Sequence, residues 1–321
     1  MMRLLRPHSR YRWIGQVPAI LMYHRIAEPE YDPWQLAVSA GRFEEQLIAL
    51  KRECEMMLLD DFARLLASNR LPSNAVAITF DDGYACNWSN AAPLLHQHRI
   101  PATFFLTTGS IGTDREFWWD ELAALAIETH APVPARVTIR EHQFLVPLDA
   151  PLVPKQELHS WKAIGKTKHP RLDAYQVLWA AMRPLSKLEQ ESILDSIWST
   201  YGCARIAREC YRALTLAEVY ALQTSELFRI GAHTVTHPAL GALLPSDQRF
   251  EIEESRATCA RLASSVSSTF SYPYGDLTPA TVDIVRNMGF LAACTTRQSS
   301  VVFRDDLFLL PRLQMTQESR L

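Results

Sequence analysis

Charge of one sign, paired cysteines and long apolar runs are all scarce in this sequence, and each scarcity excludes a class of protein. The 321 residues carry a formal net charge of only −2, so they lack the basic field of nucleic-acid binders, and we expect no nucleic-acid partner. No apolar run approaches the roughly 20 residues that a transmembrane helix needs. The cysteines include no C-x-x-C pair, which predicts buried, reduced thiols in place of a zinc site or disulfide framework. They are Cys54, Cys86, Cys203, Cys210, Cys259 and Cys294.

The N-terminal segment Met1–Trp13 is rich in arginine but lacks the apolar core of a signal peptide. We therefore expect a cytoplasmic protein. The arginines and the apolar residues between them are compatible with peripheral contact to an anionic membrane surface. A solvated, poorly ordered start of the chain is the alternative that the composition favours.

Short apolar runs alternate with helical patterns along most of the chain, which is typical of βα units and a parallel sheet. Most of the runs are continuously apolar, as expected for strands that are covered on both faces. This pattern predicts an α/β fold, a distorted (β/α)7-type barrel that forms a single domain over residues 1–321. The predicted strands are Ala19–Tyr23, Met57–Leu59, Val76–Phe80, Ala102–Thr107, Phe228–Gly231, Thr269–Tyr272 and Phe290–Cys294.

Polar residues mark where several of the helices begin. Asp60 or Asp61 can cap a helix over Phe62–Ala67, and Thr215 with Glu218 forms a capping box. Helices that start in this way directly after a strand fit the βα alternation.

The segment Ala131–Ala213 interrupts this alternation. It contains a hairpin pattern over Arg136–Val146 and two amphipathic helices, of which the second opens with a capping box from Ser186 to Glu189. We interpret the segment as a mainly helical insertion within the barrel.

Three clusters of chemically useful residues follow predicted strands, at the end where barrel enzymes place their active sites. The first is Thr79-Phe80-Asp81-Asp82-Gly83. One of its two carboxylates can bind a cation while the other handles protons. The alternative is that one aspartate caps the following helix and the other is solvated.

The second cluster is His233-Thr234-Val235-Thr236-His237-Pro238. Two histidines four residues apart can face the same ion. Pro238 disfavours helical backbone at His237, so we expect a tight turn after the strand. Because no glutamate follows His233, this is not the helical zinc-protease signature.

The third cluster is Phe270-Ser271-Tyr272-Pro273-Tyr274-Gly275, which places a backbone N–H and an aromatic ring at the mouth of a cleft or is an ordinary proline turn. Taken together, the clusters offer two imidazoles and one carboxylate. Such a ligand set leaves coordination positions open for water, as a hydrolytic metal site requires.

In this order and context, the clusters resemble the motifs of the polysaccharide deacetylases of carbohydrate esterase family 4, which share the NodB-homology domain. The resemblance covers about Ile20–Arg140 and Thr215–Arg312 and leaves out the insertion. It implies a metal-dependent hydrolase that removes an N-acetyl group from an amino sugar or glycan precursor in surface-polysaccharide metabolism. With a cytoplasmic location, the substrate would be a nucleotide- or lipid-linked precursor.

The resemblance also implies roles for individual residues. Asp81 is the expected general base, and Asp82, His233 and His237 are the expected ligands of a divalent ion, Zn²⁺ ahead of Co²⁺ or Ni²⁺. The backbone N–H of Tyr274 would help to hold the oxyanion of the tetrahedral intermediate.

Two departures from the family pattern leave an inactive, carbohydrate-binding relative as an alternative. Ser271 stands where the family commonly has an arginine that orients the catalytic aspartate, and Leu309-Leu310-Pro311-Arg312 replaces a Leu-x-His that supplies the general acid. A binding module, however, has no need to retain Asp81, the two histidines and Asp82 together.

Replacements for both missing groups are present. His24 ends the first predicted strand, as in the subgroup that deacetylates poly-N-acetylglucosamine-type exopolysaccharides, and we predict that it is the general acid; a structural histidine bonded to backbone is the alternative. Arg312 is the candidate to pair with Asp81, with a surface role as the alternative.

Trp118 and Trp119 either line a sugar groove or anchor the start of a core helix. The remaining alternative for the activity is a hydrolase of the same fold that acts on another C–N bond, such as that of a formyl-sugar.

Overall fold

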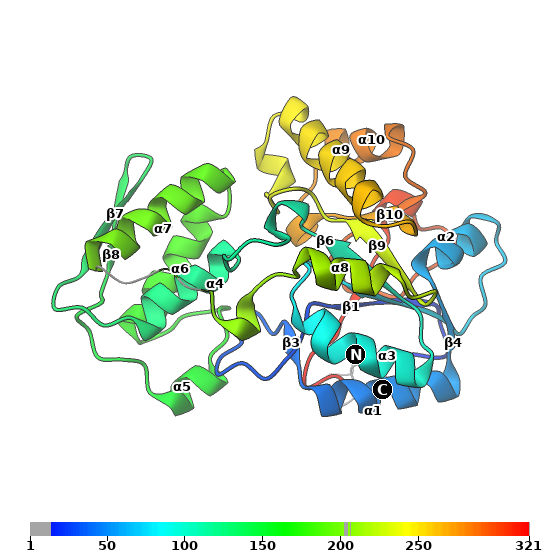
Figure 1. Ribbon diagram of the computed structural model, residues 1–321, viewed down its shortest axis with the longest axis horizontal. Coiled ribbons are helices and arrows are strands. Elements are labelled where there is room, and N and C mark those ends of the chain that lie inside the picture. The colour runs from blue at the N-terminus through cyan, green and yellow to red at the C-terminus, as the bar shows by residue number, and fades with distance from the viewer. Residues whose placement is uncertain (1–13, 202–204, 206, 321) are drawn as a thin grey trace, which may run out of the picture. The chain divides into compact units, whose positions relative to one another are not determined.

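The computed structural model describes residues 14–201, 205 and 207–320 (Figure 1). The chain forms two compact units. The first combines Met1–Glu28, Leu36–Ile111 and Leu214–Leu321, and the second combines Pro29–Gln35 and Gly112–Ala213. Met1–Trp13 lies outside the described residues, so peripheral membrane contact by this segment stays a prediction.

A sheet of eight parallel strands is the centre of the first unit, and its order is β11-β10-β9-β6-β5-β1-β12 with β4 paired to β5. The runs AILMY, AVAITF and ATFFL in β1, β5 and β6 are buried at every position, because both faces of these strands are covered. The strands are β1 (Ala19–Tyr23), β4 (Glu55–Met57), β5 (Ala75–Phe80), β6 (Ala102–Leu106), β9 (Phe228–Ala232), β10 (Val266–Ser271), β11 (Ala292–Cys294) and β12 (Leu313–Gln314). A short parallel pair, β2 (Arg25–Ile26) and β3 (Ala37–Val38), lies beside them.

Helices cover the strands of the first unit, and the predicted fold class, a distorted parallel barrel with helices, is confirmed (Figure 1). One apolar cluster joins strand residues such as Leu21 and Ile78 to Leu47 of α1, Leu222 of α8 and Ile252 of α9. The helices are α1 (Ala40–Glu53), α2 (Leu59–Ala67), α3 (Ala92–His98), α8 (Leu216–Gln223), α9 (Pro245–Leu262) and α10 (Pro279–Asn287). The predicted capping box of Thr215 and Glu218 at α8 is confirmed.

The opposite faces of the strands, which carry residues such as Ile20 and Ala77, pack against α2. The prediction that Asp60 or Asp61 caps this helix was wrong, because the helix begins at Leu59 and has no side-chain cap. Asp60 lies in the first turn and is buried, where its carboxylate accepts hydrogen bonds from Ser267 Oγ at 2.6 Å and Ser268 N at 2.7 Å. This aspartate therefore joins α2 to β10.

The segment 310–314, which ends in the edge strand β12, connects β11 to β1. Leu310 N donates to Ala293 O at 3.0 Å and Leu310 O accepts from Thr295 N at 2.8 Å, beside β11. Leu313 then pairs with Leu21 of β1. One short segment thus bridges both edges, and Arg312 lies in the middle of it.

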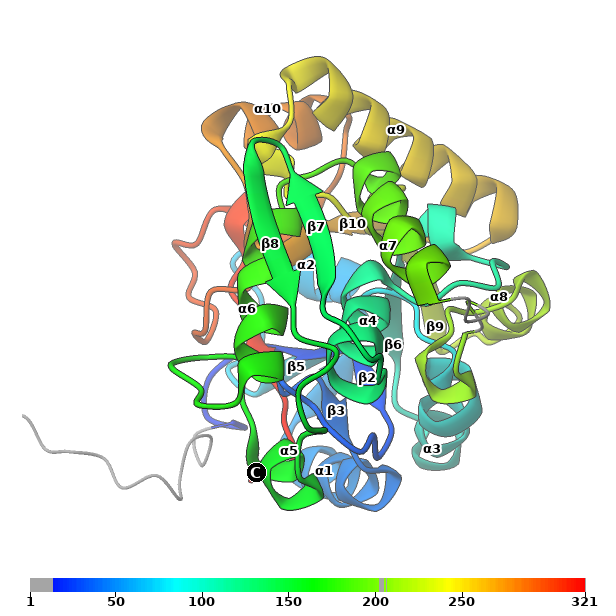
Figure 2. The same ribbon diagram turned by 90° about the vertical axis from the view of Figure 1, so that its left-hand side faces the viewer.

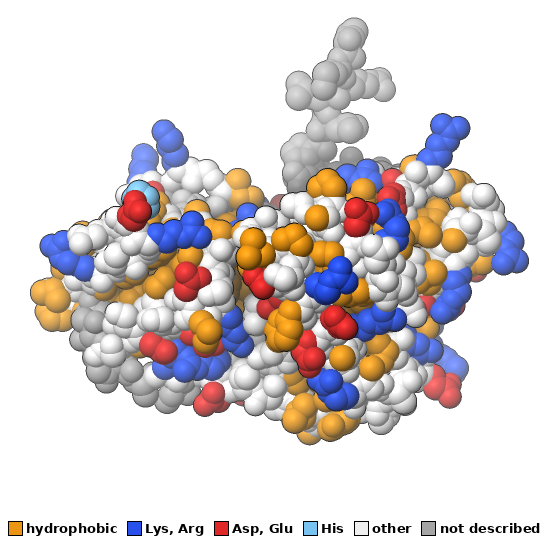
Figure 3. Space-filling model, turned by 90° about the horizontal axis from the view of Figure 1, so that it is seen from above, with side chains coloured by type: hydrophobic (Ala, Val, Ile, Leu, Met, Phe, Trp, Pro, Cys, Tyr) orange, Lys and Arg blue, Asp and Glu red, His pale blue; other side chains and the backbone are white. Residues whose placement is uncertain are grey.

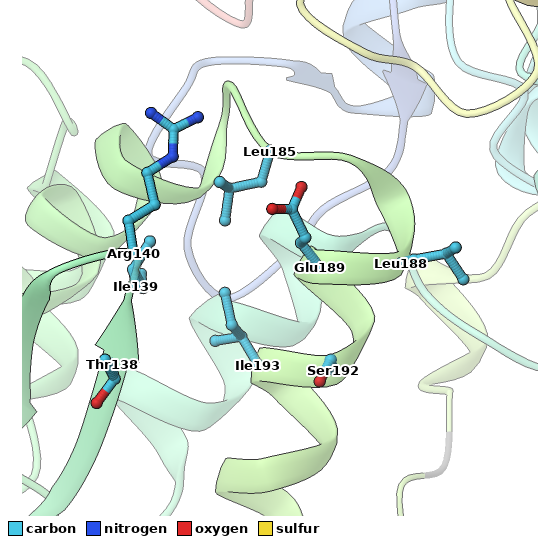
Figure 4. A pocket seen from close by; sticks show the side chains of 8 residues that line it. All are labelled: Thr138, Ile139, Arg140, Leu185, Leu188, Glu189, Ser192 and Ile193. Carbon is cyan, nitrogen blue, oxygen red and sulfur yellow. The ribbon is translucent and has the colours of Figure 1, made fainter.

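The second unit contains the predicted hairpin, β7 (Ala135–Ile139) with β8 (His142–Val146), which is confirmed as an antiparallel pair (Figure 2). The capping box from Ser186 to Glu189 is also confirmed by reciprocal hydrogen bonds. The helices of this unit are α4 (Trp118–Ala123), α5 (Lys155–Ser160), α6 (Pro170–Met182) and α7 (Lys187–Tyr201). A cavity of about 330 Å³ lies between the hairpin, with Ile139 and Arg140, and the start of α7 (Figure 4).

The second unit begins earlier in the chain than the predicted insertion 131–213, because it includes 112–130 and 29–35. One reason is the fully buried side chain of Arg171 in α6. Its guanidinium donates to the backbone oxygens of Ala126, Thr129 and Leu148 at 3.1, 2.7 and 2.6 Å. These bonds fix the residues before Ala131 to the rest of the unit.

The described cysteines form no disulfide, and Cys86, Cys259 and Cys294 are buried as predicted. Contrary to the prediction, Cys210 is exposed and Cys54 is only half-buried, and Cys203 lies outside the described residues. None of the described helices is long and apolar enough to span a bilayer. On the face that Figure 3 shows, Lys and Arg side chains are interspersed with Asp and Glu side chains.

Candidate metal centre

The residues that the sequence singled out meet at one edge of the sheet in the first unit. Asp81 and Asp82 follow β5, His233 follows β9, and Ser271 ends β10. All of these strands run parallel, with β6 between β5 and β9. Their carboxyl ends therefore lie side by side, which is the usual place of a site in a parallel sheet.

Three side-chain atoms converge there. Asp82 Oδ1 lies 3.2 Å from His237 Nε2 and 3.5 Å from His233 Nε2, and the two imidazole nitrogens are 3.1 Å apart. Each of these side chains is at most 5 % exposed. Among the described residues, this is the one group of His, Cys, Asp or Glu side chains whose ligand atoms are close enough to hold a metal ion.

The donor set fits a divalent ion. His233 Nδ1 lies 2.7 Å from Ser271 O; because a carbonyl only accepts, we assign the ring proton to Nδ1, which leaves Nε2 with a lone pair. That lone pair faces another imidazole nitrogen and a carboxylate oxygen, an arrangement that a cation stabilises. Zinc binds nitrogen and oxygen ligands at about 2.0–2.2 Å, which suits atoms that are 3.1–3.5 Å apart.

The charge states of the ligands suit metal binding as well. Burial lowers the pKa of His237, against the opposing effect of Asp82, and so favours the neutral imidazole. Burial alone would raise the pKa of Asp82, but its bonds to His233 and His237 outweigh burial and hold that pKa well below its usual value. Metal ligands must be deprotonated, and both of these shifts favour the deprotonated form.

The turns that carry the site have an uncommon backbone. Asp82, Thr234, His237 and Tyr274 all have positive φ angles, of 71°, 65°, 58° and 58°. Residues other than glycine adopt such angles at a cost of about 1–3 kcal/mol each, and they cluster at functional sites. The predicted tight turn at His233–Pro238, in place of a helix, is confirmed.

Asp81 is adjacent to the metal ligands but has a separate partner. Both terminal nitrogens of Arg312 donate to it, Nη1 to Oδ1 at 2.7 Å and Nη2 to Oδ2 at 2.6 Å. Burial pushes the pKa of Asp81 upward, but the charge and hydrogen bonds of Arg312 outweigh burial and lower that pKa. The carboxylate is therefore ionised at neutral pH.

Arg312 is fully buried and is itself held on several sides. Its Nε donates to Thr295 O at 3.0 Å and its Nη1 to Thr79 Oγ1 at 3.1 Å. Ser271, where an arginine was expected, accepts from Arg312 Nη2 at 2.8 Å and donates to Asp81 Oδ2 at 3.0 Å. A short side chain at position 271 thus leaves room for Arg312, which precedes β12.

His24 and Tyr274 lie in the first unit near these groups. His24 follows β1 and is half-buried, and its buried Nδ1 makes no hydrogen bond. The charge of His24 is one of the smaller effects that lower the pKa of Asp81 and of Asp82. Burial, which raises both pKa values, and the closer partners have larger effects. The ring of Tyr274 meets that of His237 edge to face, with centroids 4.5 Å apart.

Trp118 and Trp119 belong to the second unit, where they begin α4 and are 8 % and 5 % exposed. Trp119 stacks on Phe117 with centroids 4.8 Å apart, and Trp118 lies 6.0 Å from Trp179. This packing favours the helix-anchoring role over the sugar-groove role.

Sequence reasoning missed one buried acid beside the site, Glu251 of α9. Its carboxylate bonds the turn between the two histidines. No local pattern signals this contact, because an acidic residue within a helix is ordinarily a solvated one.

Comparison with known proteins agrees with this arrangement. The family model described as "Polysaccharide deacetylase" matches residues 68–136 and 208–293. A poly-β-1,6-N-acetyl-D-glucosamine N-deacetylase of Staphylococcus aureus (strain MRSA252) is 34% identical over 121 residues, which are 34% of this chain and 42% of that protein. The match thus spans less than half of the relative's length.

Solved structures share the fold across nearly the whole chain. The Streptococcus pyogenes deacetylase PplD, solved in complex with acetate, has a TM-score of 0.57 at 18% identity, covering 94% of this chain and 92% of that one. The structure of IcaB from Ammonifex degensii has a TM-score of 0.56 at 19% identity, covering 94% and 93%. At these identities the likeness establishes the architecture.

Proposed function

Because this chain belongs to the polysaccharide deacetylase family, we propose that it is a metal-dependent hydrolase that removes the N-acetyl group from an amino sugar in a glycan or glycan precursor. The observation that carries the proposal is that two adjacent carboxylates have different partners. Asp82 faces two imidazole nitrogens, and Asp81 faces Arg312. One is thereby equipped to hold an ion and the other to accept a proton.

Amide hydrolysis needs both of these capacities, because an amide carbonyl is a poor electrophile. A divalent ion would polarise the carbonyl and acidify water. Asp82, His233 and His237 would hold that ion, and we propose Zn²⁺ for it ahead of Co²⁺ or Ni²⁺. Asp81, kept ionised by Arg312, accepts the proton of the attacking water.

The remaining steps need a donor for the oxyanion and an acid for the leaving group. We assign the first role to the backbone N–H of Tyr274, whose ring packs on His237. We assign the second to His24, which gives a proton to the amine nitrogen as the C–N bond breaks. Acetate and a free amino sugar are then the products.

The substrate we propose is an N-acetylglucosamine oligomer with β-1,6 linkages, by analogy with the Staphylococcus aureus relative. We expect the purified protein to release acetate from such oligomers, to hold one divalent ion per chain, and to lose activity on chelation. Elemental analysis and an acetate assay check these outcomes. A protein without bound ion that gains no activity from added zinc or cobalt would be a carbohydrate-binding relative.

A panel of N-acetyl and N-formyl sugars separates the deacetylase from a hydrolase of another C–N bond. We expect acetate from the N-acetyl substrates at a higher kcat/KM than formate from the N-formyl ones. The reverse order would assign the chain to formyl-sugar hydrolysis and leave the metal chemistry unchanged.

Replacing His24 with alanine tests the assignment of the acid. We expect kcat to fall about 10²-fold, since general acids contribute at least this much to proton transfer. A substrate with a more acidic amine leaving group should recover part of the loss, because it needs less protonation. Metal content measured in parallel should be unchanged. Full turnover by the variant would remove the assignment.

A further inference from the structure

The turn between the two histidines has to be held in a conformation that it would not adopt on its own. Thr234 and His237 both have positive φ, at 65° and 58°. Residues other than glycine adopt such angles only where their surroundings impose them. The position of both imidazoles therefore depends on what restrains 233–237.

Two sets of contacts supply the restraint. On one side, the carbonyl oxygens of Thr234 and Val235 accept hydrogen bonds from the backbone of Thr108 and Gly109, at 3.1 and 2.8 Å. On the other side, the backbone N–H groups face the carboxylate of Glu251 in α9. Its Oε2 accepts from Val235 N at 2.8 Å and from Thr236 N at 2.9 Å.

Glu251 makes a third bond to the same turn, because its Oε1 accepts from Thr236 Oγ1 at 2.6 Å. The residue is only 8 % exposed, so these hydrogen bonds are largely shielded from water. Both oxygens of one carboxylate are thus committed to one turn.

We propose that Glu251 is a positioning residue for the metal centre, which holds the turn so that His233 Nε2 and His237 Nε2 converge with Asp82. This inference rests on the metal site of the proposed function. Glu251 acts through the backbone and the threonine hydroxyl, and it has no part in the proton transfers. Outer partners that orient metal ligands typically change metal affinity 10–100-fold when they are removed.

Two conservative substitutions at position 251 separate the effect of side-chain length from the effect of side-chain charge. Glu251→Asp keeps the charge but retracts the carboxylate by one methylene, so it cannot span both N–H groups and the hydroxyl. Glu251→Gln keeps the reach: its amide oxygen can accept from both N–H groups, and its NH₂ can donate to Thr236 Oγ1. If Glu251 acts by positioning the turn, Glu251→Asp should bind zinc more weakly and Glu251→Gln should bind it nearly as well as the wild type.

The readout is the zinc dissociation constant, measured by competition with a chromophoric chelator on the full chain. We expect Glu251→Asp to weaken zinc binding about 10–100-fold, with Glu251→Gln much nearer to wild type. Thr236→Val, which removes one of the three bonds, should lie between them. The control is Glu254→Asp on the same helix, whose exposed carboxylate pairs with Arg261 and should leave zinc binding unchanged.

The outcomes distinguish this inference from the function on which it rests. A wild-type chain that binds no zinc refutes the metal site itself. If the wild type binds zinc and Glu251→Asp binds it equally well, the positioning role is refuted and the metal site stands. Weak binding by Glu251→Gln with normal binding by Glu251→Asp would assign the effect to charge and overturn the inference as well.

Discussion

Replacing Asp81 with asparagine is expected to lower kcat by up to about 10⁴-fold, the upper range for loss of a general base, while zinc stays bound. Asparagine has nearly the shape of aspartate but cannot take a proton from water at neutral pH. The metal ligands Asp82, His233 and His237 are untouched by the change. Turnover and zinc content, measured on the same preparation, check the two halves of the prediction.

His233→Ala is the matched comparison, because it should remove zinc binding and activity together. If Asp81→Asn also loses its zinc, Asp81 supports the ion and the division of labour between the two carboxylates is wrong. If Asp81→Asn turns over at most of the wild-type rate, another group is the base.

Replacing Arg312 with methionine is expected to lower the free energy of unfolding by about 3–5 kcal/mol, the range for removing one partner of a buried ion pair. Burial raises the pKa of Asp81, and the charge of Arg312 is the largest of the effects that together lower it. Without the arginine, Asp81 is a buried charge beside a side chain that cannot donate. Denaturant unfolding of the metal-free protein measures the loss, and activity should fall as well.

Two further variants make this result specific. Arg297→Met removes an exposed arginine that pairs with Asp305 at 2.9 Å. It should cost about 0–1 kcal/mol, because solvent screens the charge of an exposed arginine. The double variant Arg312→Met with Asp81→Asn should recover part of the stability, since neither charge is then left alone. If Arg312→Met and Arg297→Met lower the free energy of unfolding equally, the buried pair stabilises the protein no more than the other pair does.

Much of the fold could be predicted from sequence because the strands are buried on both faces. A continuous apolar run such as AVAITF in β5 has few alternatives in a chain of this kind, and its two polar successors are then placed at the sheet edge. The sequence placed Asp82 and the two histidines after predicted strands, and the resemblance to the deacetylase family implied that they form one ligand set. The strand order, with β6 between β5 and β9, comes from the structure.

The elements that could not be predicted are those whose signal is not local. Strand β12 is two residues long, Leu313–Gln314, which is too short for any periodicity. Asp60 has the sequence position of a helix cap, but a serine far along the chain takes its carboxylate. The contacts of Glu251 could not be predicted either, because its partners belong to a turn that precedes its own helix.

The second unit shows a further limit of sequence patterns. Proline-rich composition and the hairpin marked its centre, but its edges depend on contacts of one buried side chain, Arg171, with backbone oxygens. Likewise, Trp118 and Trp119 have the composition of a sugar platform but lie in an aromatic cluster. Composition identifies such residues, and burial decides what they do.

The position of Arg312 has a consequence for the order of events during synthesis. The metal ligands and Asp81 leave the ribosome well before the segment 310–314 that bridges β11 and β1. Until that segment arrives, Asp81 has no arginine opposite it, so burying the carboxylate is unfavourable. The step that closes the sheet is the same step that brings the positive charge of Arg312 to Asp81. A nascent chain can therefore possess all three proposed ligands of the ion and still be unable to hold the Asp81 carboxylate in the interior.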